Sequence, residues 1–187
     1  VDTRDIRNGA TMLAAGYTDQ PYCAIVTHQH HTVETWVCVI TASMGGEGSA
    51  GEEVYSVTSS DLGRSWSKPV VVEPGTSLPG GHPNAYANIV LAPALNSGRG
   101  GRLFTVYNLN LKNLSLGGRA DELGSFYMRY SDDLGASWST TKYLVPYPNT
   151  WVDRQNNFKG AHHIMWTVDQ IKVLPSGVAM FAFTKIG

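Results

Sequence analysis

Hydrophobic and polar residues alternate along the chain in short runs, which is the pattern of half-buried β-strands. Turns rich in glycine, asparagine and serine separate the runs. The alternation predicts two groups of four strands followed by the start of a third group. The expected strands are Tyr22–Thr27, Thr35–Thr41, Glu53–Ser59, Val70–Glu73, Tyr86–Leu91, Arg102–Tyr107, Ser125–Tyr130, Lys142–Val145, Ile164–Val173 and Val178–Phe183.

An eight-residue pattern occurs twice, each time directly after the third strand of a group. Residues 59–66 read SSDLGRSW, and residues 131–138 read SDDLGASW. In each copy we expect the aspartate to accept hydrogen bonds from the turn's own amides, the glycine to supply a positive φ and the tryptophan to fold beneath the hairpin. These residues are Asp61, Gly63 and Trp66 in the first copy, and Asp133, Gly135 and Trp138 in the second.

Both copies match the Asp-box, S-x-D-x-G-x-[ST]-W, and on this motif the chain resembles the sialidase-like β-propellers with BNR repeats. The resemblance implies an all-β propeller whose blades are four-stranded antiparallel sheets. We expect about six blades in the complete ring, with seven as the alternative, and about two and a half in this chain. The expected division is an N-terminal segment 1–18, a first blade 19–74, a second blade 75–146 and the start of a third blade 147–187.

A ring of this size needs about 350 residues, whereas this sequence has 187. The remaining blades are therefore expected from the rest of the polypeptide, from a second fragment or from another copy. The segment Ala10–Ala15 is a candidate for completing the last blade.

Composition narrows the class of protein. The chain is 42% hydrophobic and 16% charged with a net charge of −1, so neither a membrane span nor a nucleic-acid-binding surface is expected. No cofactor is expected, and the histidines of the run His28–His31 are interpreted as a solvated hairpin tip and not as a metal site. The resemblance implies a secreted, extracellular or periplasmic protein.

Cys23 and Cys38 lie on paired strands, where a disulfide and two buried thiols both remain open.

Because neighbouring antiparallel strands run in opposite directions, each loop can be assigned to one of the two ends of the sheets. The Asp-boxes and the histidine run lie at one end. Longer loops at the other end carry acidic, basic, aromatic and histidine residues, as the mouth of a carbohydrate site would require. The catalytic candidates there are Glu47, His82, Tyr86, Asp121 and His162; the substrate-binding candidates are Gln20, Tyr22, Asn110, Arg119, Asp153, Arg154, Asn156 and Trp166.

The resemblance implies cleavage of an acidic glycan by a glycoside hydrolase. Family sialidases hold the substrate carboxylate with three arginines, and they use an aspartate acid/base with a tyrosine–glutamate nucleophile. Here the strand that would carry the first arginine reads DQPYC at residues 19–23, and Glu47 occupies the loop of the acid/base. Hydrolysis needs two carboxyl groups about 5 to 9.5 Å apart, and Glu47, Asp121 and Asp153 are the candidates.

Two other functions remain open. Some polysaccharide lyases resemble this architecture and cleave uronate chains by β-elimination, for which a base and a cation beside the substrate carboxylate are needed. The same face could instead bind glycan or protein without cleaving it. The residues available for elimination are His82, His162 and His163 as bases, Tyr86 as base or leaving-group acid, and Arg119 and Arg154 as carboxylate partners.

Overall fold

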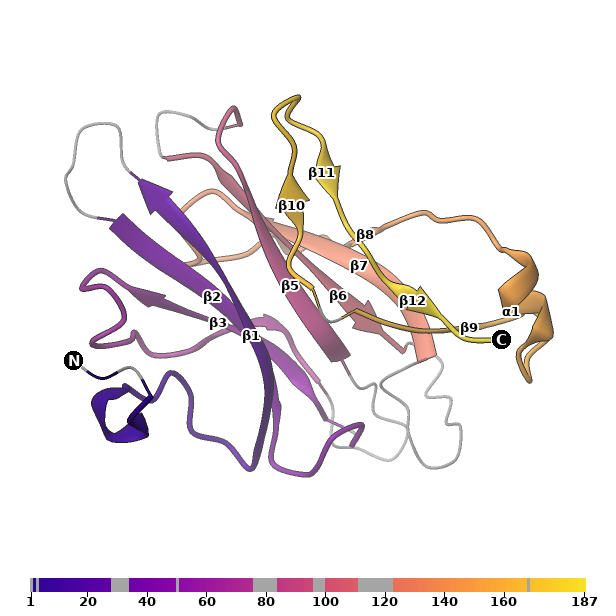
Figure 1. Cartoon of the computed structure of the whole chain (residues 1–187), viewed down its shortest axis with the longest axis horizontal. Helices are drawn as coiled ribbons and strands as arrows, with labels where there is room; N and C mark the ends of the chain where they lie inside the picture. Colours follow the sequence, from indigo (N-terminus) through magenta and orange to yellow (C-terminus); the bar gives the residue numbers. More distant parts are fainter. Residues whose placement is uncertain are drawn as a thin grey trace.

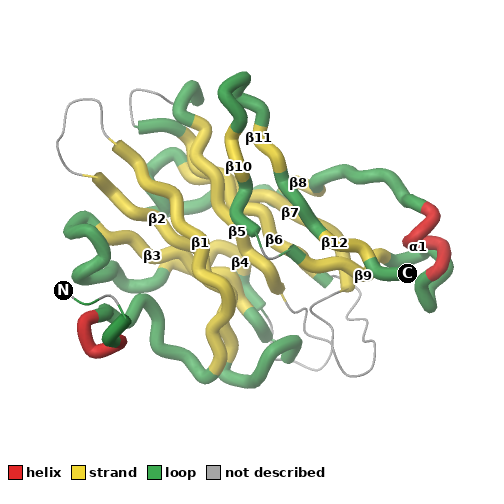
Figure 2. The backbone as a smooth tube through the Cα atoms, in the orientation of Figure 1, coloured by secondary structure: helices red, strands yellow, loops and turns green. Residues whose placement is uncertain are grey.

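The computed structural model describes residues 2, 4–27, 34–49, 51–75, 84–95, 100–110, 123–167 and 169–187. Its regular structure is almost entirely antiparallel β-strand, as predicted (Figure 2). The helical elements in these residues are short: the 3-10 helix η1 (Ile6–Asn8) and the helix α1 (Trp151–Gln155). None of the described helices has the length and apolar content needed to cross a lipid bilayer.

The first sheet contains four strands in sequence order. They are β1 (Tyr17–Thr27), β2 (Glu34–Ser43), β3 (Glu53–Ser59) and β4 (Val70–Glu73). The predicted bounds of β3 and β4 are confirmed, and β1 begins five residues earlier than predicted, at Tyr17. The segment Ala10–Ala15 forms no strand; its Met12 and Leu13 pack instead on one face of this sheet.

The second sheet repeats this order and is then extended. Its strands β5 (Asn84–Ala92), β6 (Arg102–Leu109) and β7 (Leu123–Ser131) are followed by β8 (Tyr143–Leu144), which pairs with β7. The strand β9 (His163–Trp166) also pairs with β7, nearer its start, and β12 (Thr184–Lys185) pairs with β9. The strands β10 (Lys172–Val173) and β11 (Ala179–Met180) form a separate hairpin.

The continuous strand expected over Ile164–Val173 is interrupted. The side chain of Asn88 on β5 accepts a hydrogen bond from Ile171 N at 3.0 Å and donates one to the carbonyl oxygen of Asp169. These backbone groups therefore bond to a side chain and not to a neighbouring strand. The strand expected over Val178–Phe183 is likewise shortened to β11, Ala179–Met180.

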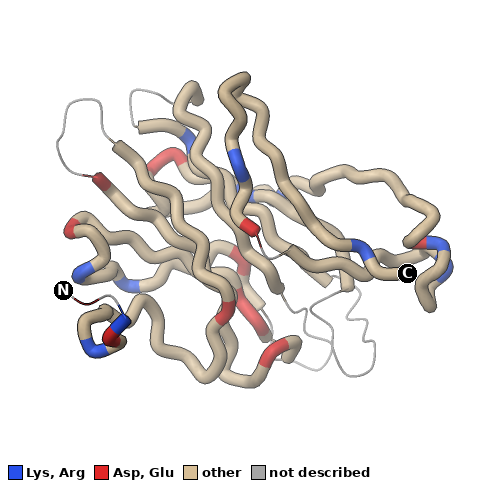
Figure 3. The backbone as a smooth tube through the Cα atoms, in the orientation of Figure 1, with Lys and Arg blue, Asp and Glu red and all other residues tan. Residues whose placement is uncertain are grey.

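Alternation along the strands gives the first sheet two apolar faces. Its inner face, with Val37 and Val39, packs against Ile89 and Tyr107 of the second sheet. Its outer face carries Cys38, Ile40 and Val57 beneath the N-terminal segment. The far face of the second sheet packs against Met165, Ile171, Phe181 and Phe183 of the C-terminal segment. Figure 1 shows the first sheet beside the second, with the β10–β11 hairpin near β5 and with β9 beside β7. Acidic and basic residues are interspersed over the described chain (Figure 3).

The two Asp-box turns have the same hydrogen bonds. The hydroxyl of Ser59 accepts from Gly63 N at 2.9 Å, and that of Ser131 accepts from Gly135 N at 2.9 Å. Each aspartate accepts from the backbone amide four residues later, at 2.9 Å in the first turn and 2.8 Å in the second. The two glycines have φ values of 79° and 82°. The predicted role of Asp and Gly in both turns is confirmed.

The alternatives for the cysteines are decided by strand register. Cys23 on β1 lies directly opposite Cys38 on β2, and the two form a disulfide. A disulfide is compatible with an oxidising, extracellular location.

Candidate functional site

The first strand of each sheet carries a β-bulge at the end away from the Asp-boxes. The register shifts within residues 19–22 of β1 and within residues 85–88 of β5. Each bulge holds one non-glycine residue at positive φ, Gln20 at 41° and Tyr86 at 54°. Bulges re-aim side chains and are common beside binding sites. Two predicted site residues therefore occupy corresponding positions in the two sheets.

Hydrogen bonds join the two sheets at this end. The amide N–H of Ala87 bonds to Thr41 Oγ1 at 3.5 Å, and Thr41 is the register partner of the bulge residue Asp19. Asn84 Nδ2 donates to the carbonyl oxygen of Glu52 at 2.9 Å. Within the described residues, the buried Oδ1 of Asn84 and Oε1 of Gln20 accept no hydrogen bond. Such buried acceptors can take donors from water or a ligand.

Two other predicted site residues hold the segment around α1 together. Asp153 is fully buried and accepts hydrogen bonds from His163 Nδ1 at 2.9 Å and Lys185 Nζ at 2.7 Å, besides capping α1 through Thr150. Burial alone would raise the pKa of Asp153, but these hydrogen bonds outweigh it and hold the pKa well below its usual range. Asn156 donates to the His162 carbonyl oxygen at 2.8 Å and is also buried. Neither side chain points outward to a ligand.

The remaining predicted residues are dispersed. Tyr22 packs against the core between the sheets, and Asn110 is buried just beyond the end of β6. Glu47 and Arg154 are exposed, Trp166 is half-buried on β9 and His162 packs edge-on against Phe158. His82, Arg119 and Asp121 lie outside the described residues. The structure thus brings Gln20 and Tyr86 to one end of the sheets and places Asp153, Arg154, Asn156 and His162 around α1.

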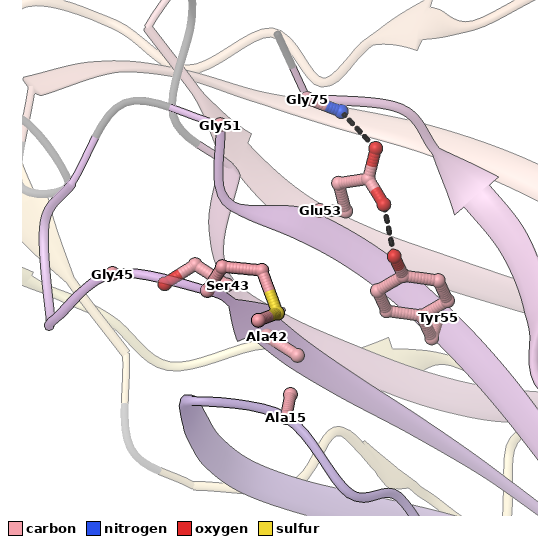
Figure 4. Close-up of a pocket in the computed structure, with 9 residues that line it drawn as sticks. Ala15, Ala42, Ser43, Gly45, Gly51, Glu53, Tyr55 and Gly75 are labelled. Atoms are coloured by element: carbon pink, nitrogen blue, oxygen red, sulfur yellow. Dashed lines mark hydrogen bonds between the residues drawn. The ribbon is translucent and has the colours of Figure 1, made fainter. Parts of the chain in front are cut away.

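A pocket of about 510 Å³ opens at the bulge end of the first sheet (Figure 4). The end of β2, the start of β3, the residues after β4 and the N-terminal segment enclose it. Its lining residues are Ala15, Ala42, Ser43, Met44, Gly45, Gly51, Glu53, Tyr55 and Gly75.

A carboxylate–tyrosine pair provides the polar chemistry of this pocket. Glu53 and Tyr55 are two residues apart on β3, so their side chains project from the same face of the strand. The Tyr55 hydroxyl donates to Glu53 Oε2, and Gly75 N donates to Glu53 Oε1 at 3.3 Å (Figure 4). Burial and then the Glu53 carboxylate raise the pKa of Tyr55 to about 12. Tyr55 is therefore a neutral hydrogen-bond donor at physiological pH.

The pocket wall depends on close backbone packing. A Cβ atom at Gly75 would lie 2.4 Å from the carbonyl oxygen of Glu52, so a larger residue would push the two segments apart. Ser43 Oγ donates to the Gly46 carbonyl oxygen at 3.4 Å and accepts from Ser49 Oγ at 3.2 Å, which folds the β2–β3 loop against the rim. The pocket is thus built by the backbone, with Glu53 as its acceptor.

The arrangement suits a ligand with hydroxyl groups. A carboxylate has about four acceptor positions, and two on Glu53 are used by Tyr55 and Gly75. None of the 9 lining residues is cationic. Within the described residues, no group of three or more histidine, cysteine or acidic side chains is placed to hold a metal ion.

Glu53 and Tyr55 were not among the predicted site residues. The signal was present, because both lie at the start of a correctly predicted strand and on the same face of it. They also follow directly after the loop that contains Glu47. What the sequence could not show is that Gly75 and Ala15, from other segments, close the pocket over them.

No protein-family model matches this sequence, and no curated protein matches it. The duplicated turn and the pocket are therefore the observations that bear on function.

Proposed function

We propose that this chain is part of a sialidase-like β-propeller that cleaves an extracellular glycan as a glycoside hydrolase. The Glu53–Tyr55 pair in the pocket is the observation that carries the proposal. The two Asp-box turns support the architecture, since they share the same hydrogen bonds and each joins the last two strands of a four-stranded set.

The pocket fits one sugar ring. Its volume of about 510 Å³ falls in the usual range of small-ligand sites, about 300 to 1,000 Å³. Glu53 can accept hydrogen bonds from neighbouring sugar hydroxyls, and the neutral Tyr55 hydroxyl can donate to another oxygen. Ala15 and Ala42 offer apolar surface to the C–H groups of the ring.

Glu53 and Tyr55 also have the arrangement of a nucleophile pair. When the Tyr55 oxygen attacks the anomeric carbon, its proton passes to Glu53 along the existing hydrogen bond. A new oxygen–carbon bond forms and the glycosidic bond breaks, with a second acid protonating the leaving oxygen. Glu47, in the β2–β3 loop beside the pocket rim, is the candidate for that acid.

The charge of the pocket determines which sugar of an acidic glycan it can hold. Because Glu53 would repel a substrate carboxylate, the ring held here is a neutral one. The acidic group of a neighbouring sugar would need a cation outside the pocket, since none of the 9 lining residues is cationic.

The test is an assay for hydrolysis on a panel of neutral and acidic glycans. The release of reducing ends measures the rate. Glu53→Gln and Tyr55→Phe should each lower kcat/KM by about 100-fold or more on the best substrate. Glu34→Gln, at the opposite end of β2, is the matched control and should leave the rate unchanged. Full activity of both pocket variants would contradict the role of the pair.

Glycan binding without cleavage is the second candidate, because Glu53 is the single carboxylate among the lining residues. Titration calorimetry with the same panel of glycans distinguishes binding from cleavage. Binding that is lost in Glu53→Gln, with no reducing ends released by the wild type, would identify a binding module. An absorbing unsaturated sugar among the products would instead identify a lyase.

A further inference from the structure

The loop between β2 and β3 forms one side of the pocket and carries Glu47. Met44, Gly45 and Gly51 of this loop are among the lining residues. In Figure 4 the chain leaves the pocket at Gly45 and returns to it at Gly51. Glu47 lies between these two glycines in the sequence and is exposed. The conformation of the loop therefore determines where the Glu47 carboxyl group lies relative to the pocket.

The sequence around Glu47 would by itself leave the backbone free to move. Glu47 stands between Gly46 and Gly48, and Gly48 has a φ of 72°. Glycine has more conformational freedom than any other residue. A carboxyl group between two glycines keeps a fixed position only where other contacts hold the backbone on both sides of it.

On the N-terminal side of Glu47, the backbone is held through the Gly46 carbonyl oxygen. This oxygen accepts a hydrogen bond from Ser49 N at 3.2 Å and another from Ser43 Oγ at 3.4 Å. Ser43 is buried at the end of β2. This side of the loop is therefore tied to a strand of the first sheet.

On the C-terminal side, a buried carboxylate holds the peptide group between Glu47 and Gly48. Gly48 N donates to Glu52 Oε1 at 2.8 Å, and Glu52 is 1% exposed. This bond is shorter than both bonds to the Gly46 carbonyl oxygen. Burying a carboxyl group costs free energy unless it is hydrogen-bonded, so the side chain of Glu52 and the loop depend on each other.

Glu52 is itself fixed by the structure around it. Its carbonyl oxygen accepts from Asn84 Nδ2 of the second sheet at 2.9 Å, and a Cβ atom at Gly75 would lie 2.4 Å from the same oxygen. The next residue, Glu53, begins β3 and is the carboxylate of the pocket. Glu52 therefore connects the loop of Glu47 to the strand that carries Glu53.

We propose that Glu52 is a positioning residue of the pocket, whose carboxylate holds the loop so that the Glu47 carboxyl group can protonate the leaving oxygen. This inference rests on the proposed hydrolysis, in which Glu47 is the acid. Loss of the Glu52 side chain leaves the hydrogen bond between Tyr55 and Glu53 in place and displaces the acid. A displacement of about 1 Å can lower a rate by about 100-fold. The loss should therefore depend on how much the leaving group needs a proton.

The first experiment compares two leaving groups in Glu52→Ala. The substrates are the best glycan of the panel and the nitrophenyl glycoside of the sugar that it releases, because nitrophenolate departs without being protonated. Glu52→Ala should lower kcat/KM by about 100-fold on the glycan and leave it close to the wild-type value on the nitrophenyl glycoside. Glu47→Gln should show the same contrast. Ser56→Ala, which removes a buried hydrogen bond on β3 away from the loop, is the matched control and should show no contrast.

Two further variants distinguish positioning from a general loss of structure. Glu52→Gln keeps an oxygen that can accept from Gly48 N, so it should recover most of the rate that Glu52→Ala loses on the glycan. The double variant with Glu47→Gln and Glu52→Ala should be no slower than Glu47→Gln alone, because the position of an absent acid has no effect. Losses that multiply in the double variant would overturn the positioning role.

The outcomes distinguish this inference from the proposed function. If Glu53→Gln abolishes hydrolysis but Glu52→Ala shows the same rate change on both substrates, the role of Glu52 is overturned and the hydrolysis stands. If the wild type cleaves no glycan of the panel, the hydrolysis and the positioning role are overturned together.

The second experiment tests the contact without a substrate. Hydrogen exchange followed by NMR measures the protection of the Gly48 amide, which should exchange at least about 10-fold faster in Glu52→Ala than in the wild type. Glu52→Asp keeps the charge but shortens the side chain by one methylene group, and it should give the same result if Glu52→Ala does not fold. An unchanged exchange rate of Gly48 in a folded variant overturns the proposal.

Discussion

Ser56 of β3 and Trp138 of the second Asp-box are joined by a 2.9 Å hydrogen bond across the interface between the two sheets. The serine is fully buried and also donates to the Gly135 carbonyl oxygen. One hydroxyl group thus satisfies both an indole N–H and a carbonyl oxygen of the neighbouring sheet. The motif that predicts the turn therefore also supplies a contact between sheets.

Replacing Ser56 with alanine should destabilise the protein. The change leaves a partly buried indole N–H and a buried carbonyl oxygen without this partner, which costs about 1 to 3 kcal/mol in the free energy of unfolding. Urea denaturation followed by tryptophan fluorescence measures the effect. Ser60→Ala, at an exposed position of the first Asp-box, should leave the midpoint unchanged. An unchanged midpoint in Ser56→Ala would contradict the inter-sheet role of the hydroxyl.

The two Asp-box glycines should respond differently to alanine. Both have positive φ, so each substitution carries a backbone cost of about 1 to 2 kcal/mol. At Gly135 the added Cβ would also lie 2.7 Å from Val37 Cγ1 of the other sheet, whereas at Gly63 it would lie 3.2 Å from the Trp36 ring of its own sheet. Gly135→Ala should therefore unfold at lower urea than Gly63→Ala. Equal midpoints would show that the second turn can move away from the first sheet at no cost.

A buried carboxylate should make stability depend on acid. Glu73 of β4 accepts hydrogen bonds from Tyr107 Oη at 2.6 Å and Lys142 Nζ at 2.7 Å, and it pairs with Arg129 Nη2 at 2.8 Å. Burial alone would raise the pKa of Glu73, but Lys142, Tyr107 and Arg129 outweigh it and lower the pKa. Because the folded pKa is the lower one, this stabilisation is complete above the unfolded value of about 4.3 and is lost as the pH falls below it.

The measurement is the free energy of unfolding of the wild type and Glu73→Gln between neutral pH and strong acid. The variant leaves Arg129 and Lys142 without their carboxylate, so it should be about 3 to 5 kcal/mol less stable at neutral pH. The difference should shrink below about pH 4.3 as Glu73 of the wild type becomes protonated. The titration of Asp153 affects the free energy of unfolding of both proteins equally, so it does not change the difference between them. A difference that stays constant with pH would assign the effect to packing.

The disulfide should stabilise the first sheet. Cys23 and Cys38 are separated by 15 positions, and a loop of this length corresponds to about 3 kcal/mol through restriction of the unfolded chain. The double variant with Cys23→Ser and Cys38→Ser should lose about that much in urea denaturation. Wild type treated with dithiothreitol should behave like the double variant. If reduction leaves the midpoint unchanged, the bond contributes nothing under those conditions.

Local signals predicted the strands and turns well, since each depends on neighbouring residues. The bounds Glu53–Ser59 and Val70–Glu73 follow from alternation alone, and the Asp-box turns follow from the geometry of aspartate and glycine. The fate of the segment after Trp166 could not be predicted in this way. It depends on the side chain of Asn88, about 80 residues earlier, which binds the backbone of Asp169 and Ile171.

The candidate site was likewise predictable where it depends on local signals and not where it depends on distant contacts. The end of the sheets where loops gather was predicted from strand direction, and Gln20 and Tyr86 lie there. The hydrogen bonds from His163 and Lys185 to Asp153 depend on contacts between α1, β9 and β12, which no local pattern encodes. The pairing of Cys23 with Cys38 likewise depends on the exact register of two strands.

The Cys23–Cys38 bond also fixes how the chain would respond to a protease. Any single cut of the backbone between these two residues leaves both fragments covalently joined. The nicked protein would migrate as one band on a denaturing gel without reductant and as two bands with it. The chain can thus lose continuity within its first hairpin and remain one molecule.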